Sequence, residues 1–259
     1  MSTLFLANNK MTDDGTVTYS LSVGTENAQF PLTNMNDEHT TKVFRSTGNS
    51  CTFVADTQSL SACDTFAIVG SGVEGLGITA CSIYLSPTTD FTGVAENVVE
   101  LNSEYSFGYV RFTSSAYRYM KVVITGGGSY CEVSNMYLGA ATEFANNGID
   151  RSSFKYSTVD NSKILKNKYG QRFINQYNKI RRMECSIKTM NSAELTILHG
   201  IYKAHGTSKP IWFMADTEED TITDADFIFS GYFFFTGRGT FKSRSGILFD
   251  SSFMLEEAV

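Results

Sequence analysis

The stretch TFAIVGSGVEGLGITACSIYL, residues 65–85, decides the fold class of this 259-residue chain. Residues 65–69 are mostly apolar and predict a buried strand, and the glycines at 70, 72 and 75 then form a GxGxxG pattern. In a dinucleotide-binding fold a helix follows such glycines, and an acidic residue about twenty positions on binds the ribose. Asp90 lies near that distance, but residues 78–85 alternate as a strand does. The stretch therefore predicts a glycine-rich connection between two strands, Gly70 to Gly75, and no cofactor.

Short strands separated by turn-forming residues are expected on both sides of this stretch. Residues 16–23 alternate, with Val17, Tyr19, Leu21 and Val23 on one face. The further expected strands are 42–46, 51–55, 65–70, 78–85, 105–113, 117–125 and 131–138. Many short strands at near-regular spacing indicate a sandwich or a barrel. We therefore expect a jelly-roll β-sandwich over residues 1–145.

Residues 146–259 are expected to form an antiparallel β domain with one packed α-helix, after a polar boundary at 145–148. Asn191 and Glu194 have the spacing of a capping box, and Gly206 followed by Pro210 ends a helix of about 191–205. Its apolar stripe consists of Leu195, Leu198, Ile201 and Tyr202. The expected strands are 182–188, 211–214, 226–236 and 246–256, the last with Ile247, Phe249, Phe253 and Leu255 on one face.

The run 226–236 is too apolar for a strand with a solvated face. It contains Phe227, Phe229, Tyr232, Phe233, Phe234 and Phe235. We expect one face in the core of its own domain and the other against a neighbouring domain or subunit. A homo-oligomeric ring would supply that cover.

The charge balance argues against a nucleic-acid partner. The net charge is −6 and the charged fraction is 19%, whereas a sequence-independent grip on phosphates needs a basic face. One basic cluster interrupts this pattern, at Lys163, Lys166, Lys168, Arg172, Lys179, Arg181 and Arg182. A solvated strand pair or loop rim is the favoured interpretation of that cluster.

The cysteines and the apolar runs define the expected compartment. Cys51, Cys63, Cys81, Cys131 and Cys185 are widely spaced and form no CxxC, so we expect buried free thiols made in a reducing cytosol and no zinc. The N-terminal residues lack the pattern of a signal peptide, and no stretch reaches the length of a membrane span.

Catalytic and metal-binding patterns are weak, and we assign no catalytic, cofactor-binding or metal-binding residue. His199 and His205 lie six positions apart on the expected helix, not at the i, i+4 spacing of two ligands, and His39 stands alone. The glycines at 126–128 and 237–239 are interpreted as hairpin turns, and the acidic run 216–220 as a solvated loop without the pattern of a calcium site. A hydrolase with paired carboxylates stays open, because such pairs meet only in three dimensions.

Two parts of the chain resemble modules of bacteriophage tail proteins. Residues 34–37, 41–46, 64–69, 117–124 and 136–139 resemble the discoidin-like, galactose-binding jelly-roll, with 64–69 as its central strand. Residues 181–187, 194–202, 206–213, 231–232 and 253–256 resemble the β domain of distal-tail and baseplate proteins. Discoidin-like modules often bind sugars, but Trp212 lies outside that module. Acidic loops of such modules sometimes hold a cation. Asn36 and Asp37 are two possible ligands, which are too few to predict a cation site.

The resemblance implies a non-enzymatic structural component of a virion tail, assembled in the host cytoplasm from several copies together with other tail or baseplate proteins. The C-terminal domain would form the ring contact and the jelly-roll would face outward. The alternative is a carbohydrate-binding module that recognises a host glycan. An enzyme, either a glycan hydrolase or an oxidoreductase using Gly70 to Gly75, is the third hypothesis.

Overall fold

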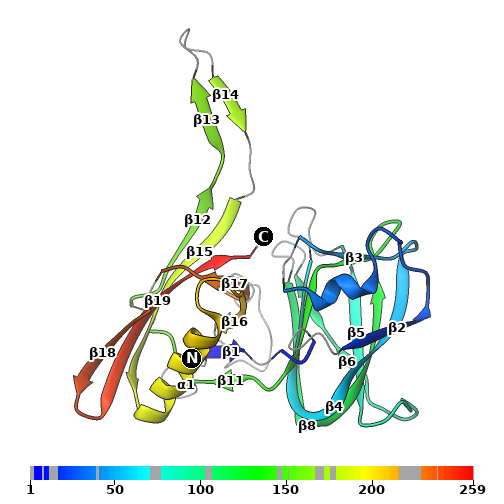
Figure 1. Ribbon diagram of the computed structural model, residues 1–259, viewed down its shortest axis with the longest axis horizontal. Helices are drawn as coiled ribbons and strands as arrows, with labels where there is room; N and C mark the ends of the chain where they lie inside the picture. The colour runs from blue at the N-terminus through cyan, green and yellow to red at the C-terminus, as the bar shows by residue number, and fades with distance from the viewer. Residues whose placement is uncertain are drawn as a thin grey trace.

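The computed structural model is mainly β, with antiparallel sheets and one α-helix in the part of the chain that it describes (Figure 1). It describes residues 3–7, 9–11, 17–38, 41–70, 77–102, 107–144, 148–150, 152–166, 172–175, 179–215, 229–237 and 239–258. The β-rich fold class predicted from the sequence is confirmed.

The jelly-roll is built on one long antiparallel ribbon of two strands, β4 (Ser50–Val69) and β8 (Phe107–Thr125). The sequence predicts four strands here, because polar residues interrupt both apolar runs. The chain passes these interruptions as β-bulges: the register shifts between Asp56 and Ser61, and Gln58 adopts a φ of 63°. A bulge bends a ribbon without ending it.

The bent ribbon folds back on itself, so that its two halves enclose a common core (Figure 1). One half pairs with β2 and β5, and the other with β7 and β10. The flanking strands are β2 (Thr18–Val23), β5 (Ala80–Ser86), β6 (Asn97–Val98), β7 (Glu100–Asn102) and β10 (Asn135–Gly139), with the 3-10 turn η2 (Leu32–Asn36) alongside. Val23 does not share the inward face of Leu21, because a register shift separates them and leaves Val23 58% exposed.

The second sheet has the order β11-β1-β16-β17-β19-β15-β12, with β18 also on β19. Its strands are β1 (Thr3–Leu6), β11 (Thr142–Glu143), β12 (Lys155–Asp160), β15 (Lys179–Met190), β16 (Ile211–Ala215), β17 (Gly231–Phe235), β18 (Thr240–Ser245) and β19 (Leu248–Glu257). β1 therefore lies in the sheet of the C-terminal half, although residues 1–145 were assigned to the jelly-roll. The expected boundary at 145–148 lies mostly outside the described residues.

The helix α1 (Ser192–His205) has the capping box that the sequence predicts. The Glu194 N–H donates to Asn191 Oδ1 at 2.9 Å, and the Asn191 N–H donates to Glu194 Oε2 at 3.0 Å. Leu198 and Ile201 are buried against the second sheet, in a core that also holds Phe213 and Phe253.

The aromatic strand β17 is covered on both faces by its own chain. Phe233 and Phe235 face the core under α1, whereas Tyr232 and Phe234 face the jelly-roll. Between the sheets, Trp212, Phe107 and Tyr137 are at most 2% exposed. The jelly-roll of the same chain therefore covers the second face of β17. The apolar character of this strand gives no support to an oligomeric ring. Phe227 lies outside the described residues.

Two smaller expectations on the turns are wrong. Ile247 lies in the turn before β19 and is 77% exposed, whereas Phe253 and Leu255 face inward as expected. Neither glycine group forms a hairpin turn: 126–128 lead from β8 to β9 (Glu132–Val133), which pairs with β3 (Phe44–Arg45). Residues 237–239 lead from β17 to β18, and both of these strands pair with β19.

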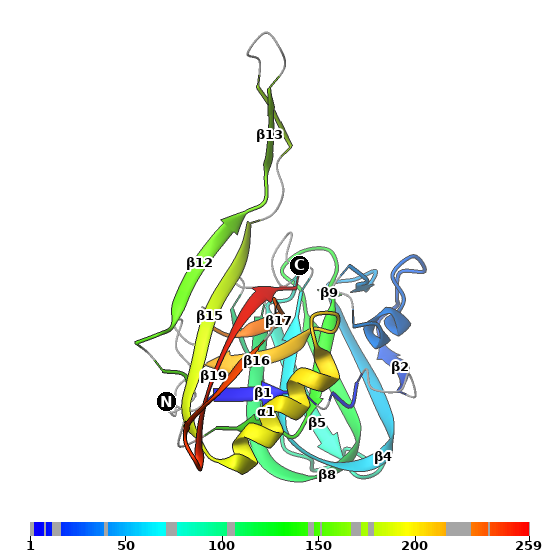
Figure 2. The same cartoon turned by 60° about the vertical axis from the view of Figure 1, so that its left-hand side comes forward.

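A two-stranded ribbon projects from the second sheet (Figures 1 and 2). It consists of β13 (Lys163–Lys166) and β14 (Arg172–Asn175), and β12 and β15 lead into it. In both views the ribbon stands away from the two sheets.

Candidate functional site

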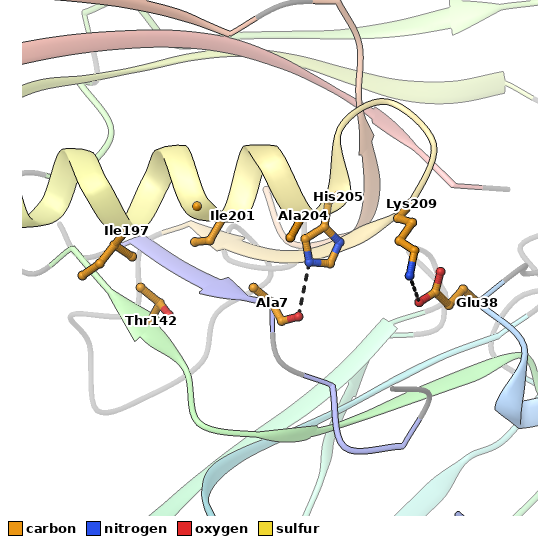
Figure 3. Close-up of a pocket in the computed structure, with 9 residues that line it drawn as sticks. Ala7, Glu38, Thr142, Ile197, Ile201, Ala204, His205 and Lys209 are labelled. Carbon is orange, nitrogen blue, oxygen red and sulfur yellow. Dashed lines mark hydrogen bonds and ion pairs between the residues drawn. The ribbon is translucent and has the colours of Figure 1, made fainter. Parts of the chain in front are cut away.

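A pocket of about 430 Å³ lies between α1, the strands β1 and β11, and the segment after η2 (Figure 3). It is lined by Ala7, Glu38, Thr142, Ile197, Gly200, Ile201, Ala204, His205 and Lys209. The Lys209 ammonium pairs with the Glu38 carboxylate at 3.4 Å, and the two His205 nitrogens lie 3.0 Å from the Pro210 carbonyl and 3.2 Å from the Ala7 carbonyl. These groups join the helix end to the neighbouring segments, which gives them a structural role.

A stacked cluster of Phe30, Arg45, Tyr130 and Glu132, called here the Arg45 cluster, occupies one end of the jelly-roll. The Arg45 guanidinium lies between two rings, 4.6 Å from the centroid of Phe30 and 4.4 Å from that of Tyr130. Its Nε donates to Glu132 Oε2 at 2.7 Å, and its Nη2 reaches the same oxygen. Cation–π contact with two rings together with a charge-assisted hydrogen bond holds the guanidinium in one orientation.

Backbone pairing explains why these four residues meet. Arg45 and Glu132 are directly opposite on the strands β3 and β9. The Arg45 N–H donates to the Phe30 carbonyl at 3.0 Å, and the Arg45 carbonyl accepts from Asn27 at 2.8 Å. Phe44 is fully buried in the core, so alternation turns Arg45 to the outer side of its strand.

The segment at Gly77 closes the inner side of the Arg45 cluster. Gly77 has a φ of 70°, and a Cβ on it would lie 3.0 Å from the Cβ and carbonyl oxygen of Glu132. Gly77 lies two positions after the last glycine of the GxGxxG pattern. Residues 71–76 lie outside the described residues, and the elements on either side are the strands β4 and β5.

The Arg45 cluster is open enough to meet a ligand. The Arg45 side chain is 29% exposed, and Phe30 and Tyr130 are partly exposed. Several residues that neighbour the cluster in the chain, or through the backbone pairing of residues 25–27 with 45–47, are polar and exposed: Thr25, Glu26, Gln29, Thr47 and Ser129. Aromatic edges beside a fixed guanidinium and hydroxyl groups suit a neutral polar ligand that has both apolar C–H faces and hydroxyls.

Comparison with known proteins adds solved structures at the level of the fold. The sequence matches no protein family and no curated protein. The chain is similar to CpGH89CBM32-5 of Clostridium perfringens in complex with GalNAc-β-1,3-galactose, at 12% identity and a TM-score of 0.43, over 50% of this chain and 99% of that chain.

Two further structures give similar values. The lectin domain of lectinolysin with Lewis B antigen has 12% identity, covers 52% of this chain and 98% of that one, and has a TM-score of 0.44. The family 32 carbohydrate-binding module of C. perfringens NanJ in complex with galactose has 17% identity, covers 53% of this chain and 98% of that one, and has a TM-score of 0.42. Likenesses of this size assign no function. None of the three is named as a tail protein, so the tail assignment stays a prediction.

The motif residues singled out in the sequence are not brought together. His199 packs on Phe241 with ring centroids 5.6 Å apart, and His205 bonds at the helix end. His39 and the acidic run 216–220 lie outside the described residues. Within the described residues, no group of three or more His, Cys, Asp or Glu could hold a metal ion. The Asp37 carboxylate pairs with Lys42 at 2.5 Å, and Asn36 Nδ2 donates to the Val17 carbonyl at 3.4 Å.

All five cysteines are free and buried, as the sequence predicts. Burial raises the pKa of the Cys63 thiol to about 11 and also raises the pKa values of Cys81 and Cys185. No helix of the described part is both long and apolar enough to cross a membrane.

The basic cluster of the sequence divides into two parts. Arg181 and Arg182, at the base of the ribbon, pair with Glu257 and Glu256 of β19. Lys163, Arg172 and Lys179 are exposed, as expected of a solvated strand pair, whereas Arg181 is buried and departs from that expectation. Lys168 and the side chain of Lys166 lie outside the described part of the chain.

The sequence analysis missed the Arg45 cluster. Arg45 and Glu132 lie in two expected strands, but nothing local pairs them, because they are 87 positions apart. The available signal is weak: each is a charged residue flanked by an apolar residue in a short strand.

Proposed function

We propose that this chain is a non-catalytic, glycan-binding adhesive protein, and that the Arg45 cluster of its jelly-roll contacts the sugar. The observation that supports the proposal is the guanidinium held between Phe30 and Tyr130 and fixed by Glu132. The cluster has no nucleophile and base pair among its four residues, which fits binding without a reaction.

A pyranose ring matches these groups chemically. Its C–H face packs on an aromatic side chain, and its hydroxyls accept from a guanidinium and donate to a carboxylate. Since the backbone around Arg45 is paired on both sides, little ordering is needed on binding. We expect a single Arg45 cluster to bind sugar weakly, because its direct contacts come from few side chains.

The first test is a glycan array followed by calorimetric titration. Galactose, GalNAc-β-1,3-galactose and Lewis B antigen are the initial probes, because similar jelly-rolls were solved with them. Arg45→Ala and Tyr130→Ala are each expected to lower the affinity at least about tenfold, which is the loss of roughly 1.4 kcal/mol.

A second aromatic–cation cluster of the same domain provides the matched control. The Lys121 ammonium lies 4.0 Å from the centroid of Tyr84 and 5.4 Å from that of Phe91. Tyr84→Ala should keep the affinity of the wild-type protein. No binding on the array would refute the proposal, and loss of binding in Tyr84→Ala alone would move the site to the Lys121 side.

We propose, as the setting of this function, a bacteriophage tail in which several copies attach through the C-terminal domain and project the jelly-roll. The projecting ribbon favours assembly with other chains, since neither sheet of its own chain covers it. Mass spectrometry of particles purified from a lysate of the producing culture tests this setting. The protein should be found in several copies per particle, and its absence would overturn the tail assignment.

A further inference from the structure

The stretch 161–180, called here the arm, includes the projecting ribbon, and its strand β13 exposes apolar side chains on both faces. Ile164 and Leu165 are consecutive in β13, so they point to opposite faces, and they are 57% and 58% exposed. An isolated two-stranded hairpin is marginally stable in water. Both properties indicate a segment that is completed by another surface.

The arm also differs in charge from the rest of the chain. It contains five Lys or Arg residues and no Asp or Glu, in a protein with a net charge of −6. The jelly-roll segment 17–144 is of opposite sign, with five Lys or Arg against twelve Asp or Glu. The jelly-roll of one molecule therefore attracts the arm of another.

One edge of the jelly-roll has the features that complement the arm. β6 is the end strand of the seven-stranded sheet order and pairs with β5 on one side. Val98 of β6 is 59% exposed, and Glu96 and Glu100, two positions before and after it, are exposed as well. Among the described strands β6 has β5 as its one partner. An apolar side chain flanked by carboxylates on such an edge is the counterpart of apolar side chains flanked by lysines.

We infer that the arm of one copy of this chain docks along the β6 edge of a second copy. Ile164 or Leu165 packs on Val98, and Lys163 and Arg172 face Glu96 and Glu100. The strand edge of the arm extends the second copy's sheet, as in strand addition. A nucleic acid would meet the same arm, but the acidic remainder of the chain repels phosphates.

The contact is head to tail, because the arm and the β6 edge belong to different parts of the molecule (Figure 1). Such heterologous contacts form a ring if the rotation closes and a filament if it does not. The inference rests on the assembly of several copies proposed above, and names the surfaces that carry it.

Light scattering of the full chain over a series of protein and salt concentrations is the test. The wild-type protein should associate, and salt should weaken the association. The variant Ile164→Ser/Leu165→Ser should raise the dissociation constant at least about tenfold. Ile247→Ser is the matched control, because Ile247 is an exposed apolar residue at a hairpin turn outside the arm, and it should associate as the wild type does.

Charge reversal tests the named partner surface. Lys163→Glu alone and Glu96→Lys alone should each weaken association, and the protein carrying both changes should recover it, since the pair is then restored with opposite signs. Glycan binding should stay unchanged in all of these proteins, which separates this inference from the role of the Arg45 cluster.

Three results would overturn the inference. A wild-type protein that stays monomeric throughout the series would remove both the docking and the assembly of several copies. Association that persists in the Ile164→Ser/Leu165→Ser variant would keep the assembly and remove the arm from it. Arm-dependent binding of a short DNA duplex or of phosphatidylserine vesicles, without self-association, would assign the arm to that partner instead.

Discussion

Trp212 of β16 lies over Phe107 of β8, with the ring centroids 5.8 Å apart. The two residues belong to different sheets, and each is at most 2% exposed. The contact joins the jelly-roll to the C-terminal sheet through an aromatic layer that also includes Tyr137 and Tyr232. Such a layer makes the two halves of the chain one cooperative unit.

Trp212→Ala is expected to lower the free energy of unfolding by about 3–5 kcal/mol, because it empties a large site in this layer. Urea unfolding followed by circular dichroism measures the loss. Trp212→Phe is the control and should lose far less, since the indole N–H has no hydrogen-bond partner among the described residues. A Trp212→Ala protein as stable as the wild type would show that the layer does not join the domains.

The ion pair of Asp56 and Arg118, at the bend of the ribbon of β4 and β8, is expected to make the free energy of unfolding depend on pH. Arg118 donates to both oxygens of Asp56, at 2.8 and 2.9 Å, and this contact holds the pKa of the carboxyl below its usual range. The stabilisation is present above the pKa of the unfolded chain and is lost as the pH falls through the folded-state pKa.

Asp56→Asn should therefore lower the free energy of unfolding by about 0.5–1 kcal/mol at pH 7, and the deficit should shrink as the pH falls below about 4. Urea unfolding of the wild type and of Asp56→Asn, at pH 7 and at a pH below about 4, measures the difference in their free energies of unfolding. Glu184→Gln, which breaks the exposed pair with Lys155, is the control and should have little effect. A deficit that is unchanged in acid would mean that the charge of Asp56 is not its cause.

Gly77→Ala is expected to disturb the Arg45 cluster. The left-handed φ costs an added side chain about 1–2 kcal/mol, and the new methyl also meets Glu132 at 3.0 Å. Gly93→Ala is the matched control, because Gly93 has a φ of 73° but no atom within 4 Å of the new methyl. Thermal unfolding should show the larger loss for Gly77→Ala. Equal losses would mean that Glu132 moves aside freely.

The five thiols are expected to react slowly in the folded protein. All are buried, and burial raises the pKa of Cys63 to about 11 and also raises the pKa values of Cys81 and Cys185, so these three hold little thiolate at pH 7. A hydrogen bond with Cys51 lowers the pKa of Cys131 to about 7, so the slow reaction of that thiol depends on its burial. Labelling with a chromogenic disulfide reagent should be complete only after denaturation. Ser243→Cys places a thiol on an exposed position of β18 and should label at once. Rapid labelling of the native wild type would contradict the burial of its cysteines.

The sequence by itself determined the features that depend on neighbouring residues. The helix at Ser192–His205 was predicted with its cap, because Asn191 and Glu194 act across a single turn. The strand at Ala80–Ser86 was readable from the alternation of residues 78–85. The burial of the cysteines followed from the apolar stretches around them.

Only the tertiary structure decided which surfaces meet. The joining of four expected strands into β4 and β8 depends on bulges, and a bulge is set by the pairing of the partner strand. Three other features also depend on segments that are far apart in the sequence. They are the place of β1 in the second sheet, the cover of Tyr232 and Phe234 by the jelly-roll, and the pairing of Arg45 opposite Glu132. Periodicity shows that a face must be buried, but the partner that buries it comes from a distant segment, and no local pattern specifies that pairing.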